Sequence, residues 1–201
     1  MTSSRLSRGL YQRATDGPAF IQARYGSARG LVRLWLSQAA RMAGAYRRFE
    51  QIRWGEVRRL VFVCSGNICR SPYAEHRAAP AGFPAISIAL RGEADRPADP
   101  VARSGARLAG LDLEAHRSTT IAQAELRDGD LLIAMEPWQA RELLDSYRVE
   151  GAQVTLLGLW SKPRRPHLHD PHTLSEHYFA SCFRVIDSGI VSIIEQLGRR
   201  S

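Results

Sequence analysis

Four short apolar runs alternate with longer helical patterns, and this alternation constrains the fold more than any other feature of the chain. The runs cover residues 61–63, 85–89, 131–134 and 154–157. Because they are nearly continuous and rich in Val, Ile and Leu, they indicate strands buried on both faces of a parallel sheet. Helical patterns cover residues 72–79, 101–109, 137–147 and 174–197. We therefore predict an α/β fold, a doubly wound four-stranded parallel sheet flanked by helices.

The positive charge of the chain is concentrated before the first strand. The 201 residues include 28 Lys and Arg and 20 Asp and Glu, a net charge of +8. Residues 1–59 hold twelve arginines and three acidic residues, a net charge of +9, so the remainder has a net charge of −1. This division predicts a basic extension at residues 1–57 and one domain at residues 58–201. Since no recognition motif accompanies the arginines, we do not expect nucleic acid as a partner.

The extension contains the pattern of an amphipathic helix over residues 28–53. Its apolar stripe includes Leu31, Trp35, Met42, Tyr46 and Phe49. Gly44 lies inside this pattern and weakens its continuity. Three roles stay open for the stripe: packing on the domain or on a second subunit, contact with an anionic membrane surface, and binding of a partner. Packing is favoured, because Trp and Tyr on one stripe are more often buried than exposed.

The apolar runs also bear on the cellular setting. None approaches the length of about 20 residues that a membrane-spanning helix needs, and arginines interrupt every run that a secretory signal would require. With 3 Cys, we expect a reduced, cytoplasmic setting without structural disulfides. Peripheral membrane association through the extension stays open. Cys182 lies in an apolar helical pattern and is predicted to be a core residue.

The segment after the first strand carries the clearest chemical pattern. Cys64 and Arg70 are separated by Ser65, Gly66, Asn67, Ile68 and Cys69, and Ser71 and Pro72 begin a helix. A loop between a strand and a helix N-terminus can direct its backbone N–H groups at an anion. Gly66 permits a tight backbone and Asn67 tolerates a left-handed conformation.

Three side chains of this segment suit the cleavage of a phosphate ester. The positive field of the loop favours the thiolate of Cys64, and the Ser71 hydroxyl can donate a hydrogen bond to it. Arg70 offers a planar fork that binds two phosphate oxygens, which a lysine cannot reproduce. The pattern therefore predicts attack on phosphorus by the Cys64 sulfur.

The run of residues 61–75, VFVCSGNICRSPYAE, resembles the active-site signature of the low-molecular-weight protein tyrosine phosphatases over nearly its whole length. Downstream, Asp170-Pro171 resembles the pair that holds the general acid of that family. Further landmarks resemble family segments at residues 97–100, 116–118, 130–136 and 158–160. The last of these resembles bacterial members linked to polysaccharide export. The resemblance spans about residues 58–197 and leaves the extension outside it.

The resemblance implies a protein-tyrosine phosphatase that works in two steps. Cys64 is the nucleophile and forms a cysteinyl-phosphate intermediate, Arg70 binds the phosphate, and Asp170 acts first as acid and then as base. Residues 65–69, Ser71 and His172 are expected to bind substrate, and His116 to support Asn67.

The resemblance implies no cofactor and no metal ion. His167, His169 and His172 lie in one loop without paired cysteine ligands, and we do not expect a zinc site there. The implied partner is a phosphotyrosine protein, such as a bacterial tyrosine kinase of exopolysaccharide assembly.

Two departures from the family pattern concern substrate preference and efficiency. His172 stands where the family has the tyrosine that forms one pocket wall, so the wall is smaller and titrates near neutral pH. Ile88-Ala89-Leu90 stand where the family has Ser-Ala-Gly, which removes a hydroxyl from the loop network. Whether Ser87 replaces that hydroxyl stays open. These changes keep a second interpretation available, a catalytically weak phosphotyrosine-binding adaptor.

Cys69 admits two interpretations. It can form a reversible disulfide with an oxidised Cys64, or it can pack beneath the loop. A thiol-linked arsenate reductase is the alternative enzyme on this scaffold. That activity needs a relay of further cysteines, and only Cys69 and Cys182 are available.

Overall fold

A computed structural model describes residues 19–199 and contains the expected four-stranded parallel sheet. Its strands are β1 (Arg59–Cys64), β2 (Ala85–Ala89), β3 (Asp130–Ala134) and β4 (Gln153–Leu156), in the order β2-β1-β3-β4. All neighbours are parallel, and Val63 pairs with both Ile88 and Ala134. The strand order reverses between β1 and β3. A ligand crevice is therefore expected at the carboxyl end of β1.

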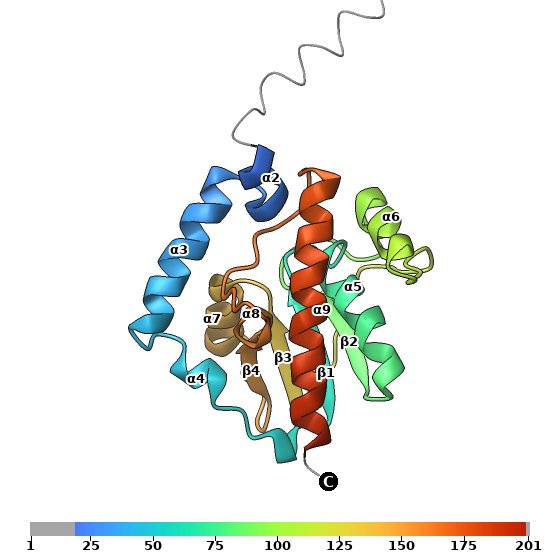
Figure 1. Ribbon diagram of the computed structural model, residues 1–201. Helices are drawn as coiled ribbons and strands as arrows, with labels where there is room; N and C mark the ends of the chain where they lie inside the picture. Colours follow the sequence, from blue (N-terminus) through green and yellow to red (C-terminus); the bar gives the residue numbers. More distant parts are fainter. Residues whose placement is uncertain (1–18, 200–201) are drawn as a thin grey trace, which may run out of the picture.

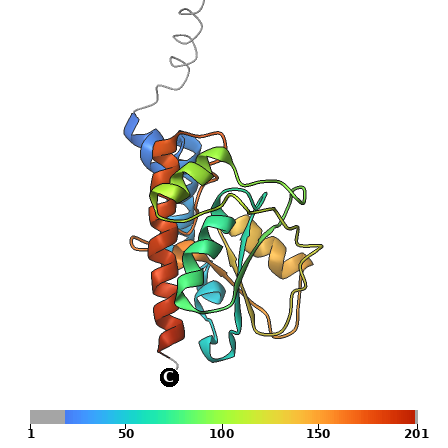
Figure 2. The same cartoon turned by 90° about the vertical axis from the view of Figure 1, so that its right-hand side faces the viewer.

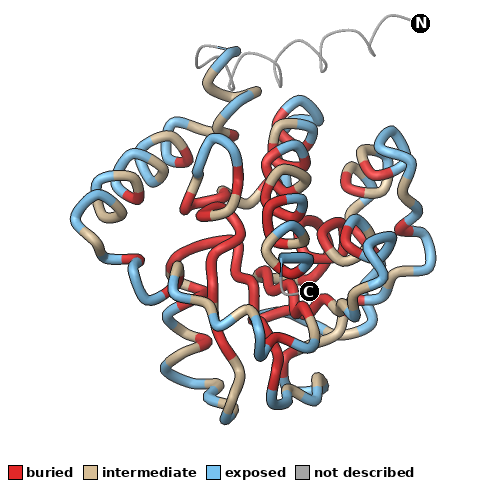
Figure 3. Tube along the Cα trace, turned by 60° about the horizontal axis from the view of Figure 1, so that its bottom comes forward, coloured by how far each residue is buried: buried red, intermediate tan, exposed pale blue. Residues whose placement is uncertain are grey.

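Helices cover both faces of the sheet. Helices α5 (Arg70–Ala78), α6 (Pro100–Leu108) and α9 (Glu176–Gly198) lie on one side and α7 (Pro137–Ser146) lies on the other (Figures 1 and 2). Because side chains alternate along a strand, Phe62 of β1 joins the core beneath α5 and α9, whereas Val61 and Val63 join the core beneath α7. Figure 3 shows the buried residues gathered along the strands and the inner side of α9.

Two helices begin at side chains that later matter for the site. Helix α6 begins after Asp99, whose carboxylate accepts hydrogen bonds from the backbone N–H groups of Val101 and Ala102. Helix α7 begins after Glu136, which forms a capping box with Gln139. Proline occupies the first turn of both helices, where its missing N–H group costs nothing.

The single helix predicted over residues 28–53 is wrong in its continuity. The extension forms α2 (Ala19–Tyr25), α3 (Ala28–Met42) and the single turn α4 (Arg47–Glu50). Gly44 has a φ of 81°, a left-handed conformation that a side chain would strain and that commonly follows the end of a helix. The sequence also did not indicate α2 or the short segments α8 (Leu157–Trp160), η1 (Trp54–Glu56) and η2 (Ala79–Ala81).

The apolar stripe of the extension divides at this break. Tyr46 and Phe49 are buried in the core on the α7 side of the sheet. Trp35 and Met42, in contrast, are 72% and 80% exposed, while Ser37 from the polar side of the predicted helix is buried. Packing on the domain therefore holds for the second half of the stripe, whereas Trp35 and Met42 do not pack on it.

Helix α2 lies against the first turns of α9, as Figure 1 shows. The first eighteen residues of the extension, with Arg5, Arg8 and Arg13, lie outside the described residues. Among residues 19–199, none of the helices combines the length and the hydrophobicity needed to cross a bilayer.

Candidate active site

The loop between Cys64 and Arg70 connects the end of β1 to the start of α5, as the sequence predicts. Asn67 has a φ of 53°, in the left-handed region that asparagine tolerates. The carbonyl groups of the loop anchor it to its surroundings: Arg91 N–H donates to Ser65 O at 2.9 Å, and Asp99 N–H donates to Ile68 O at 2.9 Å. With carbonyl groups used in this way, the loop can present its N–H groups to an anion.

Cys64 is buried, and its Sγ lies 3.0 Å from Ser71 Oγ. The direction of this contact follows from Asn67. Thr119 N–H donates to Asn67 Oδ1 at 2.9 Å, which identifies the other side-chain atom, Nδ2, as the donor to Ser71 Oγ at 2.9 Å. Because Ser71 Oγ already accepts this hydrogen bond, its own hydrogen is free to point at the sulfur. Ser71 can therefore stabilise the thiolate of Cys64.

Ser87 completes the same network. Asn67 Nδ2 donates a second hydrogen bond to Ser87 Oγ at 2.8 Å, and Ser87 donates to Glu75 Oε2 at 2.6 Å. The Ser87 hydroxyl is therefore part of the hydrogen-bond network around the loop. It answers the question raised by Ile88, which stands where the family pattern has a serine. His116 Nε2 lies 2.7 Å from the Asn67 carbonyl, and since a carbonyl only accepts, the histidine donates. Burial lowers the pKa of His116, although this hydrogen bond opposes the shift.

Arg70 is fully buried and uses only one side of its guanidinium within the protein. Nη1 donates to Glu136 Oε1 at 2.8 Å and to the Leu168 carbonyl at 2.7 Å. Nε and Nη2 are buried and have no hydrogen-bond partner in the part of the chain that is described. Nη2 lies 2.7 Å from Asp170 Oδ2 as an ion pair, without the alignment of a hydrogen bond.

The charge of Arg70 is secured by its neighbours. Burial alone would lower its pKa, but the negative groups of Asp170, Glu136 and Cys64 raise that pKa above the ordinary value for arginine. The guanidinium therefore stays positive and offers an edge of two adjacent N–H donors, a geometry that fits two oxygens of one phosphate group.

Asp170 lies at the open side of this arrangement, with 38% of its side chain exposed. His172 N–H donates to Asp170 Oδ1 at 3.2 Å. The imidazole of His172 turns to Asp99 instead, with Nδ1 3.1 Å from Asp99 Oδ2. The structure thus brings Cys64, Arg70 and Asp170 to one place and leaves His172 at the rim.

The segment that contains Cys64, Arg70 and Asp170 lies within a match to a known protein family. The model of the low molecular weight phosphotyrosine protein phosphatase family covers residues 59–201. The chain belongs to this family. It is therefore a protein-tyrosine phosphatase by descent, and the basic extension lies outside the family match.

Curated relatives of this phosphatase cover the same region. It is 31% identical over 132 residues to the low molecular weight protein-tyrosine-phosphatase Wzb of Salmonella typhi, with 64% of this chain and 87% of Wzb aligned. It is 27% identical over 142 residues to the phosphatase Etp of Escherichia coli K12, with 70% and 95% aligned.

Solved structures agree with these relatives. Wzb from Escherichia coli K30 in complex with sulphate is 26% identical, with a TM-score of 0.60 over 71% of this chain and 99% of that chain. The YwlE arginine phosphatase from Geobacillus stearothermophilus, at 18% identity and a TM-score of 0.59 over 70% of this chain and 93% of that chain, shows the fold alone.

Some polar residues of the site were not identified from sequence. Glu136 follows β3, and because parallel strands end at one edge of the sheet, its place in the chain contained a signal for this location. Gln139 accepts hydrogen bonds from the N–H groups of Met135 and Glu136 and donates to Ser65 Oγ at 3.2 Å. The roles of Glu75 and Thr119 had no sequence signal, since they depend on contacts between distant segments.

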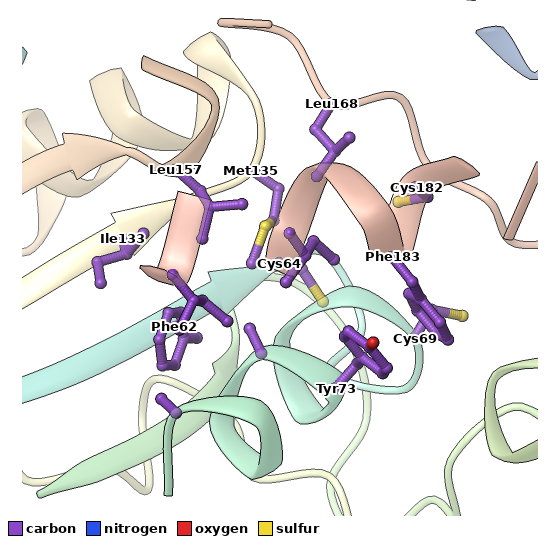
Figure 4. Packing of buried hydrophobic residues seen from close by; sticks show 14 of the residues in the cluster. Phe62, Cys64, Cys69, Tyr73, Ile133, Met135, Leu157, Leu168, Cys182 and Phe183 are labelled. Atoms are coloured by element: carbon purple, nitrogen blue, oxygen red, sulfur yellow. The ribbon is translucent and has the colours of Figure 1, made fainter. Parts of the chain in front are cut away.

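The three cysteines of the phosphatase are free and buried, and Figure 4 shows all three sulfur atoms among the side chains of one core cluster. Burial raises the pKa of Cys182 to about 12. It raises the pKa of Cys69 further, with help from Asp99 and Asp170. Cys182 is thus an unreactive core residue, as expected.

The three loop histidines do not converge on one point. His167 is buried, with Nδ1 3.7 Å from Glu136 Oε2, and its ring centroid is 5.8 Å from that of His169. His172 pairs with Asp99 at the rim.

Proposed function

We propose that this phosphatase hydrolyses phosphotyrosine in proteins, with Cys64 as nucleophile, Arg70 as phosphate ligand and Asp170 as general acid and base. The observation that supports this most strongly is the unused edge of Arg70. Nε and Nη2 are buried and form no hydrogen bond with the described residues, and Nη2 has only the poorly aligned Asp170 carboxylate beside it. This arrangement is unfavourable unless a ligand supplies two oxygens. The edge lies beside the loop that starts with Cys64, so a phosphate bound there places its phosphorus near the sulfur.

In the first step, two phosphate oxygens bind Nε and Nη2 of Arg70, and the Asp170 carboxyl group is displaced toward the leaving oxygen. The Cys64 sulfur attacks phosphorus in line, so that the S–P bond forms while the P–O bond to the tyrosine ring breaks. Once displaced from Arg70, the Asp170 carboxylate takes up a proton from solvent and gives it to the departing phenolate oxygen. The equatorial oxygens stay on Arg70 and the loop N–H groups throughout.

In the second step, Asp170 is a carboxylate and takes a proton from water. The water oxygen attacks phosphorus, the S–P bond breaks, and inorganic phosphate leaves. The sulfur departs as a thiolate, which Ser71 stabilises through its hydrogen bond. Loop residues 65–69 hold the phosphate through their backbone, and His116 keeps Asn67 in its left-handed conformation.

The finer proposals concern partner and location. A tyrosine-phosphorylated protein is the substrate class that the family supports, and a bacterial tyrosine kinase of exopolysaccharide assembly is the specific partner we infer from the similarity to Wzb and from the resemblance at residues 158–160. The reduced state that Cys64 needs suits the cytoplasm.

The test is hydrolysis of phosphotyrosyl peptides, without added metal, by the natural chain and by Cys64→Ser, Arg70→Lys and Asp170→Ala. Phosphoseryl and phosphoarginyl peptides serve as comparison substrates, since an arginine phosphatase shares the fold. We expect turnover of phosphotyrosine alone, loss of activity in Cys64→Ser, and retention of phosphotyrosyl proteins by Asp170→Ala. Full activity of Cys64→Ser, or binding of phosphopeptide without turnover by the natural chain, would contradict the proposal.

A further inference from the structure

Three side chains with metal-binding atoms converge at the rim of the phosphate pocket. A ligand atom of each of Cys69, Asp99 and His172 lies within 4.8 Å of the other two. Asp99 Oδ2 and His172 Nδ1 lie 3.1 Å apart. The proposed hydrolysis uses the backbone of Cys69 but neither its sulfur nor the carboxylate of Asp99.

Two of the three ligands are held in place by the fold. Asp99 N–H donates to the Ile68 carbonyl at 2.9 Å, and Asp99 Oδ1 caps α6 by accepting from Val101 N–H at 2.8 Å. This leaves Oδ2 directed to His172. Cys69 is the buried residue at the start of α5. His172 is the mobile member, because 48% of its side chain is exposed and can rotate.

The donor set is that of a zinc-class cation. Thiolate, imidazole and carboxylate are the three ligands that bind Zn²⁺ in tetrahedral sites, at about 2.3, 2.0 and 2.1 Å. Those bond lengths place donor atoms about 3.5 Å from one another. The three ligand atoms lie within 4.8 Å of one another, so displacements of about 1 Å bring them to that spacing, and the fourth position stays open to water or phosphate.

We propose that Cys69, Asp99 and His172 form a binding site for a zinc-class divalent cation, and that its occupation reversibly inhibits the phosphatase. On binding, the Cys69 thiol loses its proton to solvent and a metal–sulfur bond forms, so no oxidant or reductant is involved. The imidazole that completes the site is a departure from the family pattern, in which a tyrosine is expected at position 172.

Inhibition follows from where the three residues lie in the chain. Cys69 belongs to the phosphate-binding loop, and His172 follows Asp170 by two residues. A metal ion bound to both residues fixes the segment that contains Asp170 to the rim of the pocket. Phosphate then cannot replace the Asp170 carboxylate at Arg70. This part of the inference rests on the proposed function, whereas metal binding itself does not.

The binding test therefore uses the Cys64→Ser protein, in which the catalytic sulfur is absent. Zn²⁺ binding is measured by calorimetry, and Co²⁺ is used as a probe whose thiolate charge-transfer band reports a bound sulfur. We expect one ion per chain and a thiolate band. The band should disappear when Cys69→Ser is added and persist when Cys182→Ser is added. A band that survives Cys69→Ser would overturn the site.

His172→Tyr provides a second variant that changes only an exposed side chain. We expect it to weaken Zn²⁺ binding at least tenfold in the Cys64→Ser background. In the otherwise natural chain it should raise the Zn²⁺ concentration for half inhibition by a similar factor, and a chelator should restore activity of the natural chain. An unchanged half-inhibition concentration would show that Zn²⁺ acts at Cys64 and that the proposed site is not the cause.

Discussion

Ser27 Oγ lies 3.3 Å from Nε2 of His169, the residue directly before Asp170, so the N-terminal extension contacts the segment that holds the proposed general acid. The approach is close: a Cβ atom on Gly30 would lie 2.9 Å from the His169 ring. On the other side, Tyr178 of α9 donates a hydrogen bond to the His169 carbonyl at 3.1 Å. His169 is thus held between the extension and α9.

Substitution Gly30→Ala should therefore disturb acid catalysis. The added methyl group would clash with the backbone carbonyl of Tyr25 as well as with the His169 ring. The start of α3 and the His169 ring must both shift, and Asp170 with them, so we expect turnover of phosphotyrosine to fall several-fold. An activated aryl phosphate, whose leaving group needs little protonation, should be affected less. Trp35→Ala, on the exposed side of α3, is the matched control. Equal losses for both substrates would indicate a general defect and contradict a role in positioning the acid.

Glu136 should be needed to orient Arg70. Replacing it by alanine leaves the buried guanidinium with a missing charge partner, which typically costs about 3–5 kcal/mol of stability. Glu136→Gln keeps an acceptor for Nη1 and should cost less. We expect kcat/KM to fall at least tenfold in Glu136→Gln and further in Glu136→Ala, with denaturant unfolding reporting stability separately. Near-normal kcat/KM in both variants would show that Leu168 O suffices to hold Arg70.

Ser71→Ala should destabilise the thiolate of Cys64. A hydrogen bond to a charged group contributes about 1.5–3 kcal/mol, which corresponds to a loss of roughly tenfold to a hundredfold in the populated thiolate. When the rate of alkylation by iodoacetate is measured at a series of pH values, the rise of this rate should occur at higher pH than in the natural chain. The value of kcat should fall. Ser192→Ala removes a buried hydroxyl without a hydrogen-bond partner among the described residues and should leave the alkylation profile unchanged.

The buried imidazole of His167 predicts a loss of stability in acid. Burial lowers its pKa from 6.5 to about 4, although Glu136 opposes the shift. The unfolded chain therefore binds this proton at higher pH than the folded chain does, so the stabilisation is complete above pH 6.5 and is lost as pH falls toward 4. The difference amounts to about 3 kcal/mol at most.

His167→Gln should reduce this pH dependence, because the amide does not titrate. Denaturant unfolding of the two proteins between pH 7 and pH 4 provides the measurement. If the free energy of unfolding falls equally with pH in both proteins, a group other than His167 causes the loss of stability in acid. Activity is not needed for this comparison, so it can be made in the Cys64→Ser protein.

The sheet, its flanking helices and the catalytic loop could be predicted because they depend on local patterns. Continuous apolar runs indicate buried strands, and Cys64, Arg70 and Asp170 occur in motifs of fixed order. The division of the extension at Gly44 was not predictable with certainty, since a single glycine is tolerated within many helices. The exposure of Trp35 depends on how α3 is placed against the domain, and the periodicity of the sequence does not determine that placement.

The polar side chains that contact the loop could not be predicted either, because these contacts also depend on how distant segments are placed. Ser87 and Glu75 interact with Asn67 only because β2 lies beside β1 and α5 crosses above them. Glu136 could be predicted in part. Its position after β3 indicates the correct edge of the sheet, but it does not indicate the contact with Arg70. Local patterns thus led to the groups we propose to react, and the fold supplied the groups that hold them.

The ion pair between Asp170 and Arg70 makes the general acid an intramolecular competitor of the substrate. A carboxylate attached to the same chain is present at a high effective concentration, so ligands that offer a single oxygen to Arg70 compete poorly with it. A phosphate group offers oxygens to Nε and Nη2 at once and can displace it. In the proposed mechanism, Asp170 therefore selects for ligands with two oxygens before it acts as an acid. The phosphate group that enters displaces the carboxyl group that then protonates its leaving oxygen.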